Sequence, residues 1–176
     1  MSNYLTEKSL GKYLKQIFPK HEFIRDRVVP NSDIQKRPDY RNDDLMLIIE
    51  FDGYGHYSNP DNILTDGFKD DIYKDMGYDI VRIPYFIQMS KDIVELLFDR
   101  DVDIEQVYPH GFIDIKAMLP AYFCELGIIR FKKDLDKFKI VKDEIILSLG
   151  QKYDEYGNIN YVLPPSLYNL LIEGIG

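Results

Sequence analysis

The chain has 176 residues, of which 45% are hydrophobic and 14% aromatic, and this composition provides a packed core and excludes disorder of the whole chain. Its 22 Lys and Arg residues stand against 30 Asp and Glu residues, and the formal charge of -8 disfavours broad, nonspecific DNA binding, although a metal site would itself use carboxylates. A single cysteine excludes an intrachain disulfide, and the lack of an apolar leader or a membrane-length run in the sequence predicts a cytoplasmic protein with no membrane partner.

The first predicted element is a helix over residues 6–18, because Leu10, Leu14 and Ile17 recur at helical spacing. Residues 21–30 contain several strand formers and predict an extended segment.

Two short strands are predicted next, over residues 37–41 and 45–51, with a turn at 42–44 between them. The second strand is a continuous apolar run, which is typical of a central strand covered on both faces. Residues 53–61 are predicted to form a loop.

A helix over residues 66–76 that ends at Gly77, a strand over 78–83 and a helix over 90–98 follow. A hairpin followed by a helical crossover predicts an α/β fold, more narrowly an α+β mixed sheet flanked by helices. We assign residues 1–100 to this core.

Residues 101–176 are predicted to form a mostly helical C-terminal extension of unknown role. The helices are expected over residues 120–126, 133–149 (with Gly150 as the stop) and 167–172. A hairpin around Gly157-Asn158 is expected over residues 152–163.

Acidic residues gather at the end of the apolar strand. Glu50 and Asp52 are two residues apart and therefore share one face of the strand, while Phe51 points to the other face. Two buried carboxylates side by side are unfavourable unless a positive charge lies between them, and a divalent cation meets that need.

Asp39 supplies a third acid from the preceding strand. If Asp43-Asp44 is a two-residue turn, Asp39 faces Ile48 and lies diagonally opposite Glu50, about 7–8 Å away at Cα. Any even-length loop keeps Asp39 on that face, and carboxylates at this separation can reach one ion. The alternative is that Asp39 ends a turn and Glu50 lies at a solvated strand edge.

A glycine-rich loop follows these acids. Gly53 and Gly55 permit sharp turns and the close approach of a ligand to the backbone. His56, four residues beyond Asp52, is either near enough to activate or deliver water or is a polar surface residue.

Taken together, these residues resemble the PD-(D/E)xK nuclease superfamily, and within it the very-short-patch-repair-like branch that includes the bacterial domain of unknown function numbered 559. The segments that carry the resemblance are Arg37-Pro38-Asp39, Ile49-Glu50-Phe51-Asp52-Gly53 and His56-Tyr57. The rest of the branch's pattern is matched, in order along the chain, by Glu7, Asp66, Lys69, Gly77 and Arg82. The resemblance covers about residues 4–98.

The resemblance implies a restriction-endonuclease-like αβββαβ core and a Mg²⁺- or Mn²⁺-dependent endonuclease that cuts DNA in repair, restriction, or a mobile-element or phage context. Asp39 and Glu50 would hold the metal, with the Phe51 carbonyl as a further ligand, and Glu7 would act through water or orient a partner. The metal would polarise the scissile phosphate and lower the pKa of the attacking water. The residues expected to contact substrate are Arg37, Tyr57 and Arg82.

One residue departs from the superfamily pattern. Asp52 stands where the general superfamily has a catalytic lysine, and an aspartate cannot stabilise developing negative charge. His56 is the candidate replacement, with Lys69 as a base that has moved to the next helix. The plainer interpretation of Lys69 is a solvated helix residue, and Arg82 needs acidic partners because it lies among apolar residues.

Three functions therefore compete. The first is the metal-dependent nuclease, with DNA as the expected partner, RNA as the second choice and a homodimer as a further expectation. The second is a catalytically inactive protein of the same fold that binds nucleic acid or protein, which the charge of -8 and Asp52 favour. The third is an unrelated metal-binding or structural domain whose acids coincide by chance.

Overall fold

A computed structural model describes residues 4–113 and 118–172 of the chain. The described residues divide into two compact units. The first unit takes its residues from 1–52, 64–85 and 89–107, and the second from 53–63, 86–88 and 108–176. The chain therefore passes between the units several times, and each unit is described by itself.

The first unit is built on a mixed four-stranded sheet with the strand order β1-β2-β3-β4. The strands are β1 (Ile24–Arg25), β2 (Tyr40–Asn42), β3 (Leu47–Asp52) and β4 (Asp79–Pro84). The first three strands pair antiparallel, and β3 and β4 pair parallel, as a hairpin followed by a helical crossover predicts. The α/β class and the mixed sheet are confirmed.

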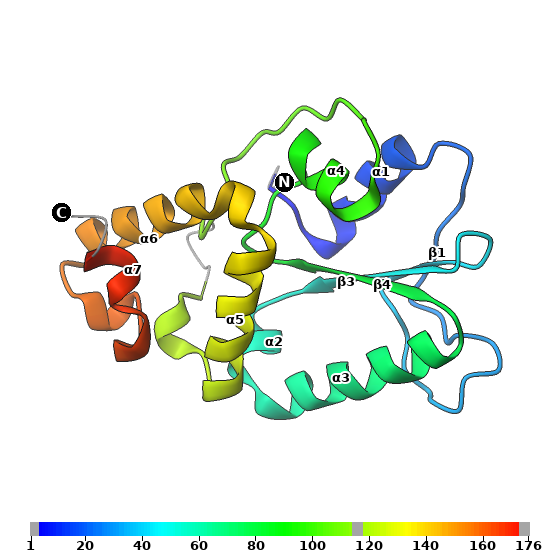
Figure 1. The fold of residues 1–176 in the computed structure, drawn as a ribbon, viewed down its shortest axis with the longest axis horizontal. Helices are drawn as coiled ribbons and strands as arrows, with labels where there is room; N and C mark the ends of the chain where they lie inside the picture. The colour runs from blue at the N-terminus through cyan, green and yellow to red at the C-terminus, as the bar shows by residue number, and fades with distance from the viewer. Residues whose placement is uncertain (1–3, 114–117, 173–176) are drawn as a thin grey trace. The chain divides into compact units, whose positions relative to one another are not determined.

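Three helices flank the sheet: α1 (Glu7–Ile17), α3 (Pro60–Asp75) and α4 (Lys91–Phe98). Helices α1 and α4 lie on one side of the sheet and α3 lies on the other (Figure 1). Both faces of the central strand β3 are thus covered, which explains its apolar run.

The structure confirms the helices that apolar spacing and capping residues predict for α1 and α4. Thr6 caps α1 through a reciprocal capping box with Ser9, and Leu10, Leu14 and Ile17 are buried as their spacing predicts. Ser90 caps α4 by accepting a hydrogen bond from the backbone N–H of Ile93.

The predicted extended segment over 21–30 is wrong in length. Only Ile24–Arg25 pairs in the sheet, because Asp26 adopts a positive φ of 49° that turns the chain out of strand geometry. The predicted strand over 37–41 is shifted, and only Tyr40–Asn42 pairs.

The hairpin between β2 and β3 fixes the position of Asp39. Its connection has four residues, 43–46, and the predicted two-residue turn is wrong. Tyr40 pairs with Ile49, so continuing the register by one residue places Asp39 directly opposite Glu50 rather than diagonal to it. Because four is also an even number, Asp39 keeps the face that the shorter turn would have given it.

Two boundaries around α3 also differ from the sequence interpretation. The loop predicted over 53–61 contains a short helix, α2 (Gly55–Ser58), and α3 begins at Pro60, before the predicted residue 66. Proline at a first helical position loses no intrahelical hydrogen bond, so Pro60 starts the helix without strain. Gly77, with φ of 92°, ends the segment as predicted.

The second unit is mainly helical, which agrees with the expected character of the C-terminal region. Its described elements after α4 are η1 (Pro120–Tyr122), α5 (Glu125–Lys137), η2 (Lys139–Val141), α6 (Lys142–Tyr156), η3 (Ile159–Tyr161), η4 (Pro165–Leu167) and α7 (Asn169–Ile172). The single helix predicted over 133–149 is wrong, because the chain breaks at Phe138 between α5 and α6. The predicted inward residues are nonetheless all buried: Leu135, Phe138, Val141, Ile145 and Leu149.

The predicted hairpin over 152–163 is also wrong. Helix α6 continues through Gly150 to Tyr156, and Gly157, in the left-handed conformation with φ of 66°, ends it. A glycine-asparagine pair suits a helix C-cap as well as a hairpin turn, and the buried residues of α6 favour the helix.

Within the second unit, α5 holds the segment that carries His56. A Cβ on Gly127 would lie 1.7 Å from the backbone oxygen of Tyr57, so only glycine permits this approach. The Tyr57 hydroxyl donates a hydrogen bond of 2.7 Å to the Asp134 carboxylate. The backbone N–H of Cys124 donates a hydrogen bond to the backbone carbonyl oxygen of Tyr57. Among residues 4–113 and 118–172, no helix combines the length and apolar composition that a bilayer crossing requires.

Candidate functional site

Strand β3 presents two buried acids toward α3. Glu50 is 4% exposed and Asp52 is 1% exposed, whereas Phe51 between them is only half-buried. Glu50 ion-pairs with Lys69 of α3, and Asp52 ion-pairs with Arg82 of β4. The shared face of the two acids, predicted from the period of a strand, is therefore the face that α3 covers.

The ion pair of Glu50 and Lys69 is buried. Lys69 Nζ lies 2.8 Å from Glu50 Oε1, and the two side chains are 10% and 5% exposed. The interpretation of Lys69 as a solvated helix residue is wrong. Burial raises the pKa of Glu50, and the Lys69 and Arg82 charges oppose that rise.

Asp39 lies beside this pair. Its Oδ2 accepts a hydrogen bond of 2.7 Å from the backbone N–H of Phe51. Burial, together with the negative charges of Glu50 and Glu7, raises the pKa of Asp39 to about 6, although the Phe51 hydrogen bond and Lys69 act in the opposite direction. Asp39 has no ion-pair partner among the residues that the structure describes.

Glu7 occupies the first turn of α1, as predicted, but it lies at the surface. Its carboxylate pairs with Arg25 of β1 at 2.7 Å, and both side chains are nearly half exposed. Glu7 is close enough to Asp39 to raise the pKa of that carboxyl, so it belongs to the same electrostatic neighbourhood.

Arg82 is surrounded by aspartates. Its guanidinium contacts Asp52 at 2.7 Å, Asp70 at 2.8 and 3.0 Å, and Asp66 at 3.4 Å. The need of Arg82 for acidic partners is confirmed.

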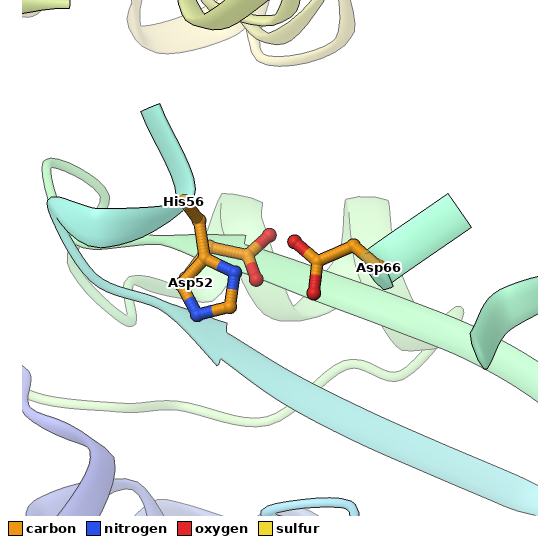
Figure 2. Close-up of side chains that lie close together, drawn as sticks. All are labelled: Asp52, His56 and Asp66. Carbon is orange, nitrogen blue, oxygen red and sulfur yellow. The ribbon is translucent and has the colours of Figure 1, made fainter. Parts of the chain in front are cut away.

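A second group of acids involves His56. One ligand atom each from Asp52, His56 and Asp66 lie within 4.8 Å of one another (Figure 2). His56 is thus grouped with Asp52 and Asp66, whereas the sequence placed it with Asp39 and Glu50. Both aspartates of this group are already paired with Arg82, which offsets part of their charge.

The two remaining residues expected to contact substrate have different environments. Arg37 is exposed and makes a long ion pair of 3.8 Å with Asp26. Tyr57 is completely buried, and its hydroxyl is bound to Asp134, so its side chain is part of the core of the second unit.

The donors at Asp39 and Glu50 fit a hard divalent cation. Such ions prefer oxygen ligands, and both residues offer carboxylate oxygens on neighbouring strands. Glu50 Oε1 is buried and lies 2.8 Å from Lys69 Nζ. Beside this pair, burial raises the pKa of the Asp39 carboxyl, and an added positive charge would stabilise the ionised form of that carboxyl.

Asp70 is the site residue that sequence reasoning did not identify. The signal available was its spacing: Asp66, Lys69 and Asp70 are three and four residues apart, so they share one face of α3. A face of this kind is ordinarily solvated, and only the position of Arg82 in the next strand indicates that it is buried.

Comparisons with models of protein families, with curated proteins and with solved structures found no match to this chain. The geometry and chemistry of the site are therefore the basis for a function.

Proposed function

We propose that this chain is a Mg²⁺- or Mn²⁺-dependent endonuclease that hydrolyses DNA phosphodiester bonds at a site of the PD-(D/E)xK type. The observation that carries the proposal is the position of Lys69, whose ammonium group lies 2.8 Å from Glu50, in the strand opposite Asp39. Two carboxylates and a lysine in this arrangement offer metal ligands and a positive charge at the same place, although the lysine comes from a helix instead of from the strand.

Each residue has a proposed part. Asp39 and Glu50, with the Phe51 carbonyl, would hold the cation, and the cation when bound would polarise the phosphate and lower the pKa of water. Lys69 would supply the positive charge that Asp52 cannot supply, and it would hold Glu50 in place. Glu7 would orient water or a side chain at the outer edge of the site.

The surface beside Asp39 suits a polyanion despite the net charge of the chain. Arg25, Arg27 and Arg37 are exposed, and Arg25 stands opposite Tyr40 in the sheet, next to Asp39. Arginines bind phosphate groups well, so a DNA backbone is the preferred partner, with RNA as the second choice. A homodimer in which two sites cut the two strands remains part of the proposal.

A second function is favoured by one specific observation. Lys69 and Arg82 already neutralise Glu50 and Asp52, so the buried acids are stable without a cation. A protein of this fold that binds nucleic acid or protein without cutting it is therefore the alternative.

DNA cleavage distinguishes the two functions. Supercoiled, nicked and mismatched DNA and single-stranded RNA are incubated with the protein in Mg²⁺, in Mn²⁺ and in chelator. We expect cutting of DNA that needs the metal and is lost in Asp39→Ala and Glu50→Ala proteins that remain folded by circular dichroism. Cutting that survives both substitutions would place the activity elsewhere, and no cutting of any substrate would favour the binding protein.

A further inference from the structure

Helix α3 is attached to the sheet in two different ways along its length. Its C-terminal half joins an apolar cluster, in which Tyr73 packs with Val29, Ile48 and Tyr78. In its N-terminal half, Leu64 and Phe68 are 64% and 59% exposed, whereas Asp66 and Lys69 are buried. Charged contacts therefore hold the part of the helix that carries Lys69.

Arg82 makes those contacts. Its Nε and Nη2 atoms bind the two carboxylate oxygens of Asp70 at 3.0 and 2.8 Å, which is the bidentate arrangement that favours arginine over lysine. Nη2 also lies 3.4 Å from Asp66, and Nη1 donates to Asp52 at 2.7 Å. One guanidinium thus joins α3 to β3 and β4.

The two aspartates of α3 that Arg82 binds, Asp66 and Asp70, flank Lys69 on the helix. Asp66 lies three residues before Lys69 and Asp70 directly after it, so fixing these two aspartates fixes the turn from which the Lys69 side chain extends. Arg82 also stands opposite Glu50 in the parallel register of β3 and β4. Glu50, which pairs with Lys69, and Arg82, which anchors the helix of Lys69, are therefore neighbours across β3 and β4.

We infer that Arg82 is a positioning residue, which holds Lys69 against Glu50 by clamping Asp66 and Asp70 of α3, and that the Asp52 side chain serves this clamp. The inference rests on the proposed function for its catalytic meaning, but the clamp itself is a structural claim. Each guanidinium nitrogen is engaged by an aspartate, so Arg82 holds the site together and does not contact the substrate.

Reductive methylation of lysines, read by peptide mass spectrometry, tests the clamp without any substrate. The variants are Arg82→Lys, which keeps the charge but cannot bind Asp70 through two nitrogens, and the milder Asp70→Asn. Lys69 is expected to be protected in the unaltered protein, and its methylation rate is expected to rise about tenfold in both variants, which corresponds to the loss of about one charge-assisted hydrogen bond. Lys74, exposed on the same helix, is the internal control and should react equally in all three proteins.

Either of two results would overturn the inference. If Lys69 stays protected from methylation in folded Arg82→Lys and Asp70→Asn proteins, other contacts position it. If the methylation rate of Lys74 rises in parallel with that of Lys69, the substitutions loosen α3 as a whole. If Arg82→Lys does not fold, Asp70→Asn decides the question alone.

Nuclease kinetics then separate this inference from the proposed function. A positioning residue that does not touch substrate should lower kcat and leave KM unchanged in the Arg82→Lys protein. A rise in KM with kcat unchanged would make Arg82 a substrate contact and would contradict the inference. Absence of cutting by the unaltered protein would refute the proposed function, while the methylation result would still decide whether the clamp exists.

Discussion

Replacing Lys69 with methionine is expected to lower the free energy of unfolding by about 3–5 kcal/mol and to reduce DNA cleavage by roughly 10²–10³-fold. The reason for the first effect is that Glu50, only 4% exposed, would keep a buried charge without a partner. The second effect follows because Lys69 is the positive side chain nearest to the proposed metal ligand Glu50. Urea denaturation and plasmid cleavage measure the two quantities.

The loss of stability should depend on pH. Burial raises the pKa of Glu50, and without Lys69 nothing at 2.8 Å opposes this, so Glu50 becomes protonated more readily in the folded variant. The destabilisation should therefore shrink as the pH falls and the carboxyl takes up a proton. The Lys69→Met, Glu50→Gln double variant should recover most of the stability and none of the cleavage.

Lys74→Met is the matched control, since Lys74 is exposed on the same helix and its loss changes the net charge equally. It should leave stability within about 0.5 kcal/mol and cleavage unchanged. If Lys69→Met changes stability and cleavage no more than Lys74→Met does, the ion pair with Glu50 contributes nothing to either and the site described above is wrong.

Asp39→Asn is expected to stabilise the protein at pH 7 while it abolishes metal-dependent cleavage. The folded-state pKa of Asp39 is raised from 3.8 to about 6, so at pH 7 the ionised carboxylate opposes folding. Asparagine removes that charge, and its side-chain oxygen can still accept the hydrogen bond from Phe51. We expect a gain of about 1–2 kcal/mol at pH 7, after allowing for the partial exposure of Asp39.

The direction of the pH dependence follows from the raised pKa. The unfavourable contribution of Asp39 is absent below pH 3.8, where the carboxyl is protonated in both states, and it is complete once the pH has risen through about 6. The stabilisation by Asp39→Asn should therefore be present at pH 7 and disappear near pH 4. Asp71→Asn, which removes an exposed acid from α3, should show no such difference. A loss of stability in Asp39→Asn at pH 7 would contradict the environment described for Asp39.

Much of the fold of the first unit was predictable because its signals are local. The capping box of Thr6 and Ser9, the apolar run of β3 and the glycine at 77 each specify a boundary through short-range chemistry. The hairpin register was not predictable, since the length of the connection depends on the positive φ of Met46, which no residue preference indicates.

The second unit was harder to predict, for a physical reason. Phe138 and Val141 continue the apolar spacing of a helix, so their pattern gives no sign that the chain turns there. Both residues are buried on either side of the break, which shows that packing of the whole unit decides where α5 ends.

The candidate site was predictable as a set of acids but not as a set of partners. Glu50 and Asp52 share a face because of strand geometry, and Asp39 follows from the parity of the hairpin connection. Lys69 and Asp70 come from a helix that crosses behind the sheet, so their pairing with Glu50 and Arg82 depends on tertiary packing. Sequence spacing within α3 alone describes an ordinary solvated face.

Binding of Mn²⁺, followed by the electron paramagnetic resonance signal of the free ion, tests the metal site without any substrate. We expect a site that is present in the unaltered and Asp71→Asn proteins, lost in Asp39→Asn and weakened in Glu50→Gln, with affinity that rises with pH through about 6 as Asp39 loses its proton. Failure of the unaltered protein to bind Mn²⁺, or binding that survives Asp39→Asn and is lost in Asp66→Asn, would contradict this expectation.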